Sequence, residues 1–156
     1  MKKAIDNMYK VMDIGMIILS ITLVGVVFIN IIARRIGMSM TWTDEVSRLA
    51  FVWLAMFAAA IAHNKGMHPA FTMLAEKLTA KNARILILGI NLIIMIFLGF
   101  LLVGGIEYLI QTYNQKTSIL RISVGWKYMA VPFTGAVMLI ETILQTVSVW
   151  NEKKKI

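Results

Sequence analysis

The sequence predicts an all-α integral membrane protein that crosses the bilayer four times. Hydrophobic residues make up 59% of the 156 residues and charged residues only 15%, whereas soluble domains contain about 45–50% and about 25%. A chain this short has too little interior to bury that much apolar surface in water. Its apolar residues gather in four long runs, with most basic residues between them. We therefore expect a single four-span membrane domain over residues 1–156, with spans at about residues 14–33, 42–64, 85–106 and 128–150.

The first span is expected over residues 14–33, which carry no charged side chain. As an α-helix this run extends about 30 Å, the thickness of a bilayer hydrocarbon core. Lys2 and Lys3 precede it, as basic residues precede the apolar part of a secretory signal peptide. The apolar run is too long for such a peptide, and no small-residue cleavage pattern follows it. We expect the segment to be retained as a membrane span.

The second span begins with a cluster of charges. Asp44 and Glu45 lie in its first turn, where acidic groups interact favourably with the helix dipole. Arg48 follows them by four and three residues, which places opposite charges one helical turn apart. Trp42 and Trp53 bracket the cluster as interface-type anchors. We predict a structural or subunit-interface site, in which Arg48 pairs with the two acids at a protein-covered membrane boundary.

The fourth span contains one ionisable residue, Glu141, near its middle. An ionised carboxylate is costly in the bilayer, so this side chain should face a partner or water. One interpretation is a proton- or sodium-coupling site. The other is a packed, hydrogen-bonded or protonated contact to another helix or subunit. The second is favoured, because a lone acid without a broken helix gives little support to ion coupling.

The connections between the spans differ in character. Residues 67–84 carry an amphipathic pattern that predicts a short helix lying in the membrane interface. Residues 107–127 are unusually apolar, and we expect them to pack on protein or to enter the interface. Lys and Arg number three, four and three in the N-terminal segment, the second loop and the C-terminus, against three in each other loop. The positive-inside rule then places both termini in the cytoplasm.

No residue pattern predicts catalysis or a bound cofactor. His63 and His68 are the two histidines, and neither a cysteine nor a nearby carboxylate completes a metal site with them. We expect His63 to mark a helix exit at the lipid headgroups. The serines lack a credible histidine and acid partner, and no phosphate-binding glycine loop is present. Basic residues that flank spans suit lipid headgroups and not nucleic acid.

Small residues recur along the second span. Ala55 and Ala59, and likewise Ala58 and Ala62, have the small-xxx-small spacing that lets membrane helices approach closely. This surface can be covered within the bundle or by another protein. A four-span bundle without a broken helix pair or an apparent polar pathway describes an accessory subunit better than a self-sufficient transporter.

The order of residues in the second span is also specific. An aromatic residue, an acidic pair, an arginine and an F-V-W run follow one another in Trp42-Thr43-Asp44-Glu45-Val46-Ser47-Arg48-Leu49-Ala50-Phe51-Val52-Trp53. Further segments follow in order: Ala58-Ala59-Ala60-Ile61-Ala62, Gly66-Met67-His68, Ser118-Ile119-Leu120-Arg121-Ile122-Ser123, Trp126-Lys127-Tyr128, and Pro132 with Gly135. Over essentially its whole length the chain resembles the small membrane subunit of tripartite ATP-independent periplasmic (TRAP) transporters, the DctQ-like family.

The resemblance implies a division of labour. Members of that family pair with a large multi-span subunit that carries the substrate and sodium ions, so no cofactor is expected in this chain. A periplasmic binding protein delivers the substrate, usually an organic acid, and the small subunit extends the scaffold and helps to dock it. The location implied is a bacterial inner (cytoplasmic) membrane. Sialic acids and C4-dicarboxylates are common family substrates; overall likeness slightly favours sialic acid, and no residue of this chain decides between them.

Two other classes stay open. One is a small four-helix multidrug exporter that works as a dimer. Such exporters depend on an acid in the first span, and residues 14–33 contain none. The other is a structural or assembly subunit of an unrelated membrane complex, which composition does not exclude. An exporter should transport its substrate alone, whereas a scaffold subunit should not.

Overall fold

The structure, a computed structural model, describes residues 2–64 and 79–151. Within these ranges the regular structure is helical, apart from one isolated β-bridge. The helices are α1 (Lys2–Arg35), α2 (Trp42–Asn64), α4 (Ala80–Thr112), α5 (Gly125–Tyr128) and α6 (Ala130–Asn151). Four segments are long and apolar enough to cross a membrane: Asp6–Arg35, Trp42–Asn64, Asn82–Thr112 and Gly125–Trp150. The predicted all-α fold with four membrane spans is therefore confirmed.

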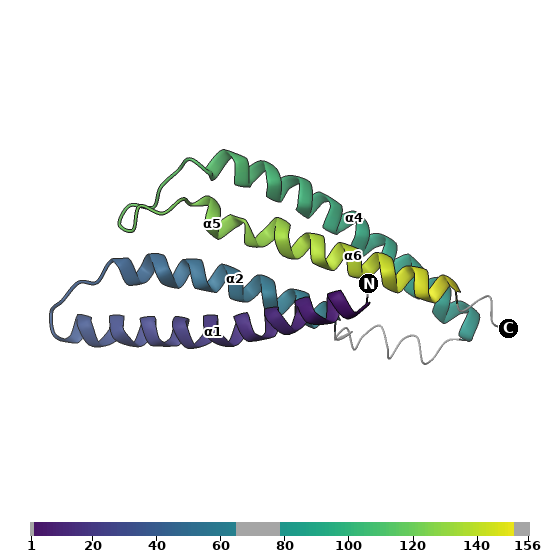
Figure 1. Ribbon diagram of the computed structural model, residues 1–156, viewed down its shortest axis with the longest axis horizontal. Helices are drawn as coiled ribbons and strands as arrows, with labels where there is room; N and C mark the ends of the chain where they lie inside the picture. The colour runs from purple at the N-terminus through teal and green to yellow at the C-terminus, as the bar shows by residue number, and fades with distance from the viewer. Residues whose placement is uncertain (1, 65–78, 152–156) are drawn as a thin grey trace.

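Two antiparallel helical hairpins lie side by side (Figure 1). One consists of α1 and α2, the other of α4 with α5 and α6, and α2 packs against α6 where they meet. The start of α1 and the end of α6 lie toward one end of the bundle, and both short connections lie toward the other. We call these the termini side and the loop side. The buried apolar core joins three helices near the termini side and consists of Tyr9, Met12, Ala60, Ile61 and Val137.

Helix α1 is longer than the predicted span. It begins at Lys2 instead of residue 14 and has 34 residues, or about 51 Å of helix against about 30 Å of hydrocarbon core. Tyr9 and Met12, in this extension, are only 6% and 2% exposed. The extension is therefore part of the packed bundle. Polar residues within it hid this role from the hydrophobicity pattern.

The turn after α1 has a specific sequence cause. Gly37 has a φ of 75°, which glycine adopts without the steric cost that a Cβ atom brings. The Met38 amide donates to the Ala33 carbonyl at 2.9 Å, and the Gly37 amide donates to the Arg34 carbonyl at 3.3 Å. These two bonds form a Schellman motif that ends the helix. The chain can then reverse into α2 within a few residues.

The fourth span is interrupted near its start. Pro132 has no amide hydrogen to donate to the carbonyl four residues earlier, and the helix is broken at Met129 between α5 and α6. The Met129 amide still donates to the Gly125 carbonyl at 2.8 Å, and the Phe133 amide to the Met129 carbonyl at 3.2 Å. The span therefore continues in one direction across the break, from Gly125 to Trp150.

The sequence made predictions for the connections at residues 67–84 and 107–127, and the structure describes the second far more fully than the first. The interfacial helix predicted over residues 67–84 lies largely outside the described residues; from Ala80 onward the chain belongs to α4. The apolar connection before α5 forms part of its own backbone hydrogen bonds: the Thr117 amide donates to the Ile122 carbonyl and the Val124 amide to the Gln115 carbonyl, both at 2.8 Å. Several of its apolar side chains stay exposed to the surroundings of the chain: Tyr113, Ile119, Leu120 and Ile122.

Candidate functional site

A buried carboxylate joins the two hairpins on the termini side. Glu141 of α6 is 7% exposed. Its Oε2 accepts a hydrogen bond from the Tyr9 hydroxyl, and its Oε1 accepts from Asn64 Nδ2 at 2.6 Å and Gln145 Nε2 at 3.2 Å. We call Tyr9, Asn64, Glu141 and Gln145 the termini-side seam. It ties α1, α2 and α6 together through one side chain.

Glu141 lies beside the end of α2, opposite Asn64, the last residue of that helix. The fourth span runs from Gly125 to Trp150, and its midpoint falls between residues 137 and 138. Glu141 is therefore about one helical turn from the middle of its span, close to the expected position. The hydrogen bonds fit the packed-contact interpretation of this acid.

More polar contacts continue along α6 toward its end. His63 Nε2 lies 2.9 Å from Thr142 Oγ1, and the His63 side chain is buried. Helix α2 ends at Asn64, one residue after His63, which agrees with a helix exit at this point. The His63 side chain nevertheless points into the bundle; His68 lies outside the described residues. Asn91 Nδ2 donates to Thr146 Oγ1 at 3.1 Å and joins α4 to α6. Arg84 donates to the last carbonyls of α6, including that of Trp150 at 2.8 Å.

On the loop side, Glu45 holds the connection before α5. Its two carboxylate oxygens accept hydrogen bonds from the backbone amides of Ile119 and Leu120, both at 2.9 Å. Hydrogen bonds to an ionised acceptor are stronger than neutral ones, and two adjacent amides match the two oxygens of a carboxylate. We predicted that Glu45 would pair with Arg48. That prediction was wrong, because the loop amides occupy the carboxylate.

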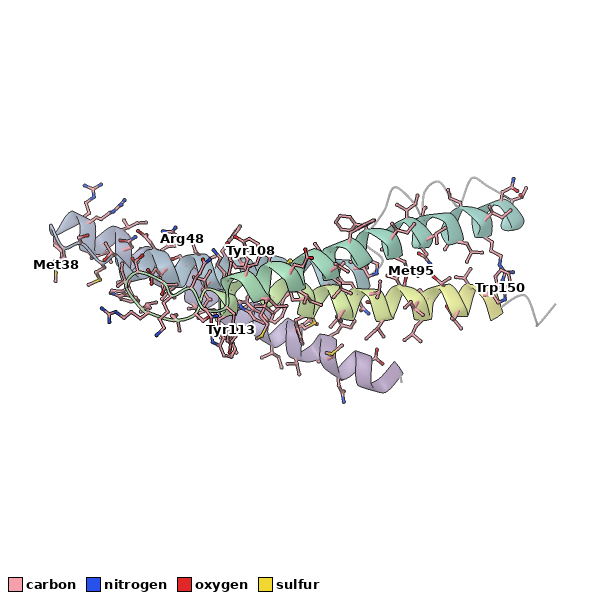
Figure 2. The ribbon with its side chains drawn as sticks, turned by 90° about the horizontal axis from the view of Figure 1, so that it is seen from above. Met38, Arg48, Met95, Tyr108, Tyr113 and Trp150 are labelled. Atoms are coloured by element: carbon pink, nitrogen blue, oxygen red, sulfur yellow. The ribbon has the colours of Figure 1, made fainter. Side chains whose placement is uncertain are left out.

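The other two charges of the predicted cluster also have separate partners. Asp44 Oδ1 accepts from Asn30 Nδ2 of α1 at 3.2 Å, and Arg48 Nε donates to the Asp44 carbonyl at 3.3 Å. No ion pair joins Asp44, Glu45 and Arg48, all of which are among the described residues. Figure 2 shows Arg48 on the hairpin of α1 and α2, between the tip at Met38 and the middle of the bundle. Its guanidinium stays exposed.

The two tryptophans have different environments. Trp42 is 38% exposed at the start of α2, as expected of an interface residue. Trp53 packs between the hairpins: its indole N–H donates to the Trp126 carbonyl at 3.0 Å, and its ring meets Phe57 edge-on at 5.4 Å. Its ring centroid also lies 6.2 Å from that of Phe133. The prediction of an interface anchor missed this role of Trp53. We call the contacts of Glu45 and Trp53 the loop-side cluster.

The sequence did not point to Tyr9, Asn64 or the amides at residues 119 and 120. Tyr9 precedes the expected first span, and the backbone contacts of Glu45 depend on a loop conformation that no motif specifies. Among the described residues, no three His, Asp or Glu side chains gather as a metal site would need. The polar side chains of the two regions instead bond to other helices or to the loop, an arrangement that fixes the positions of helices.

These features define a multi-pass membrane protein whose buried polar groups connect its own spans. Residues 23–152 match the family described as the DctQ component of tripartite ATP-independent periplasmic transporters. The match covers most of the chain, so the chain belongs to this family of small transporter permease subunits. It is a transport protein and not an enzyme.

Individual relatives are more distant. The chain is 24% identical over 102 residues to the sialic acid TRAP transporter small permease protein SiaQ of Vibrio cholerae, covering 65% of this chain and 59% of that protein. It is 28% identical over 121 residues to a putative TRAP transporter small permease protein of Haemophilus influenzae, covering 77% and 74%. It is 27% identical over 105 residues to the C4-dicarboxylate TRAP transporter small permease protein DctQ of Rhodobacter capsulatus, covering 65% and 46%. The chain thus spans only about half to three fifths of the two relatives whose names state a substrate.

Proposed function

We propose that this chain is the scaffold subunit of a sodium-coupled TRAP transporter that imports an organic acid. In this proposal a large multi-span subunit carries the substrate and sodium ions, and a periplasmic binding protein delivers the substrate. The observation that carries the proposal is the termini-side seam. Glu141, the acid that could have served ion coupling, accepts hydrogen bonds from three neighbouring side chains of the same bundle.

The surface of α2 supports a large membrane partner. Ala55, Ala58 and Ala59 are exposed along one side of this helix, following exposed Phe51 by four, seven and eight residues. Small side chains let the backbone of a neighbouring helix approach, which favours association between membrane helices. Of the two small-xxx-small pairs, Ala55 and Ala59 are therefore both exposed, whereas Ala62 of the second pair is partly buried.

The names of two relatives support the proposed substrate class. One carries sialic acid in its name and another C4-dicarboxylate, and both compounds bear carboxylates. We propose an organic acid as the cargo, with sialic acid as the first compound to test. Its contacts would lie on the large subunit and the binding protein.

A reconstitution experiment tests the proposal. We expect no substrate uptake by this chain alone in proteoliposomes. Uptake should require its large partner subunit and binding protein, and should fall to background when an inward sodium gradient is replaced by potassium. Sodium-independent uptake by the full system would remove the symport part of the proposal. Robust uptake or drug export by the isolated chain would contradict the scaffold function and favour the exporter alternative.

We further propose that the termini side faces the cytoplasm of a bacterial inner membrane. The support is the larger number of Lys and Arg residues in the N-terminal segment, the second loop and the C-terminus. Single cysteines at Asn7, near the start of α1, and at Ser39, in the turn after α1, provide the test, since both residues are exposed. An impermeant thiol reagent applied to intact spheroplasts should label Ser39→Cys and not Asn7→Cys. The reverse pattern would invert the orientation.

A further inference from the structure

Two adjoining hollows on the loop side share a pair of basic residues. The first, of about 280 Å³, is lined by polar groups that include Lys116, Ser118 and Ser123. The second, of about 320 Å³, is lined by the apolar side chains of Leu23, Phe51 and Val52 together with three polar residues, one of which is Ser47. Arg48 and Lys127 line both. Both hollows therefore combine basic with apolar side chains, and most of the polar residues line the first.

The polar hollow carries an excess of positive charge. Arg48, Lys116 and Lys127 line it together with one acid, Glu45. Both oxygens of that acid accept backbone amides, and the three cations outnumber it, so the hollow keeps a net positive charge. Arg48 is exposed and forms one long hydrogen bond of 3.3 Å, from Nε to its own helix, which leaves its terminal guanidinium donors for a ligand. This chemistry suits an anion with several acceptor oxygens, such as a phosphate.

The second, more apolar hollow indicates that the ligand also has an apolar part. Leu23 of α1 and Phe51 and Val52 of α2 line it, and Phe51 is 59% exposed. Arg48 lies about 9 Å of helix from Trp42 at the start of α2, and Phe51 lies about 5 Å deeper. Long basic side chains at such a depth reach toward the headgroups while their stems lie along apolar surface. A small soluble anion would leave the apolar hollow unfilled.

We propose that the two hollows form one site for an anionic phospholipid. The phosphate lies between Arg48 and Lys127, the polar headgroup enters the hollow with Lys116, and an acyl chain runs along Leu23, Phe51 and Val52. The site occupies the leaflet at the loop side. Its assignment to the periplasmic leaflet rests on the proposed orientation, but lipid binding itself does not, so failure of one leaves the other testable.

Native mass spectrometry of the purified full chain tests the site with defined lipids. Phosphatidylglycerol should be retained about tenfold better by the wild type than by the double variant Arg48→Gln/Lys127→Gln, since charge-assisted hydrogen bonds are lost. The matched control is Arg34→Gln/Arg35→Gln, which removes the same charge from the same side but outside both hollows. This control should retain the lipid within about twofold of the wild type. If both double variants lost phosphatidylglycerol retention equally, general attraction between charges would explain the binding, and the proposal would be overturned.

Further arms test the two parts of the ligand separately. Diacylglycerol, which lacks the phosphate, should be retained poorly, and glycerol phosphate, which lacks the acyl chains, should not compete with the lipid. Phe51→Ser should weaken retention while the basic pair is intact. Retention of diacylglycerol equal to that of phosphatidylglycerol, or full displacement by glycerol phosphate, would overturn the proposal. Unchanged helicity by circular dichroism confirms that each variant is folded before it is compared.

Discussion

The termini-side seam and the loop-side cluster both join the two hairpins, but by different means. In the seam, a buried carboxylate accepts donors from α1, α2 and its own helix. In the cluster, an acid in the first turn of α2 accepts the backbone amides of a loop, and an indole donates to a backbone carbonyl. Burial makes an unpaired polar group costly, whereas an exposed one can turn to water. The seam should therefore control helix packing, and the cluster the position of the loop.

The largest effect is expected at Glu141. Glu141→Leu leaves the Tyr9 hydroxyl and the Asn64 amide without their acceptor in a buried site. We expect a loss of about 2–3 kcal/mol in the free energy of unfolding, with Glu141→Gln losing less because one acceptor oxygen remains. Thermal unfolding in detergent, followed by circular dichroism, measures both variants. Tyr9→Phe, which removes a single donor, is the matched control and should fall between Glu141→Gln and the wild type.

The same variants separate the two interpretations of this acid. A packing role predicts that uptake by the assembled transporter falls in proportion to the amount of folded small subunit. An ion-coupling role predicts that Glu141→Gln keeps its thermal stability and abolishes sodium-dependent uptake. The second outcome would show that the termini-side seam is not a purely structural region.

The spans could be predicted from the sequence because a bilayer requires long apolar runs, and these appear directly in composition. The relative depth of the helices could not. It depends on how the hairpins are staggered, and this stagger places Glu141 beside Asn64 and brings Tyr9 into the core. A hydrophobicity pattern treats each span alone and does not contain this information.

The loop-side residues show a second limit. The sequence singled out Glu45, Arg48 and Trp53, and the structure gives important contacts to all three. Helical spacing could propose partners only within one helix, so it paired Glu45 with Arg48. The actual partners of Glu45 and Trp53 lie more than 70 residues away in the chain. The sequence could therefore predict which residues make contacts here, but not which residues they contact.

The next effect in size is expected at Glu45. Glu45→Gln keeps the shape of the side chain but removes the charge that strengthens two hydrogen bonds. We expect faster amide hydrogen exchange at Ile119 and Leu120, with little change in the unfolding temperature. Arg48→Gln is the matched control, because it changes a neighbouring charge that does not contact those amides. If Arg48→Gln accelerated exchange at both amides as much as Glu45→Gln does, the result would contradict this prediction. It would instead support a charge-paired network centred on Arg48.

The smallest effect is expected at Trp53. Trp53→Phe removes the donor to the Trp126 carbonyl but keeps an aromatic ring against Phe57 and Phe133. One neutral hydrogen bond contributes about 0.5–1 kcal/mol, less than the seam loses with Glu141. Trp53→Ala should cost more, because it also removes the ring that fills the space between α2 and α6. Thermal unfolding of both variants measures the two contributions. If Trp53→Phe were as damaging as Trp53→Ala, the single hydrogen bond to the backbone, and not aromatic packing, would hold the hairpins together on the loop side.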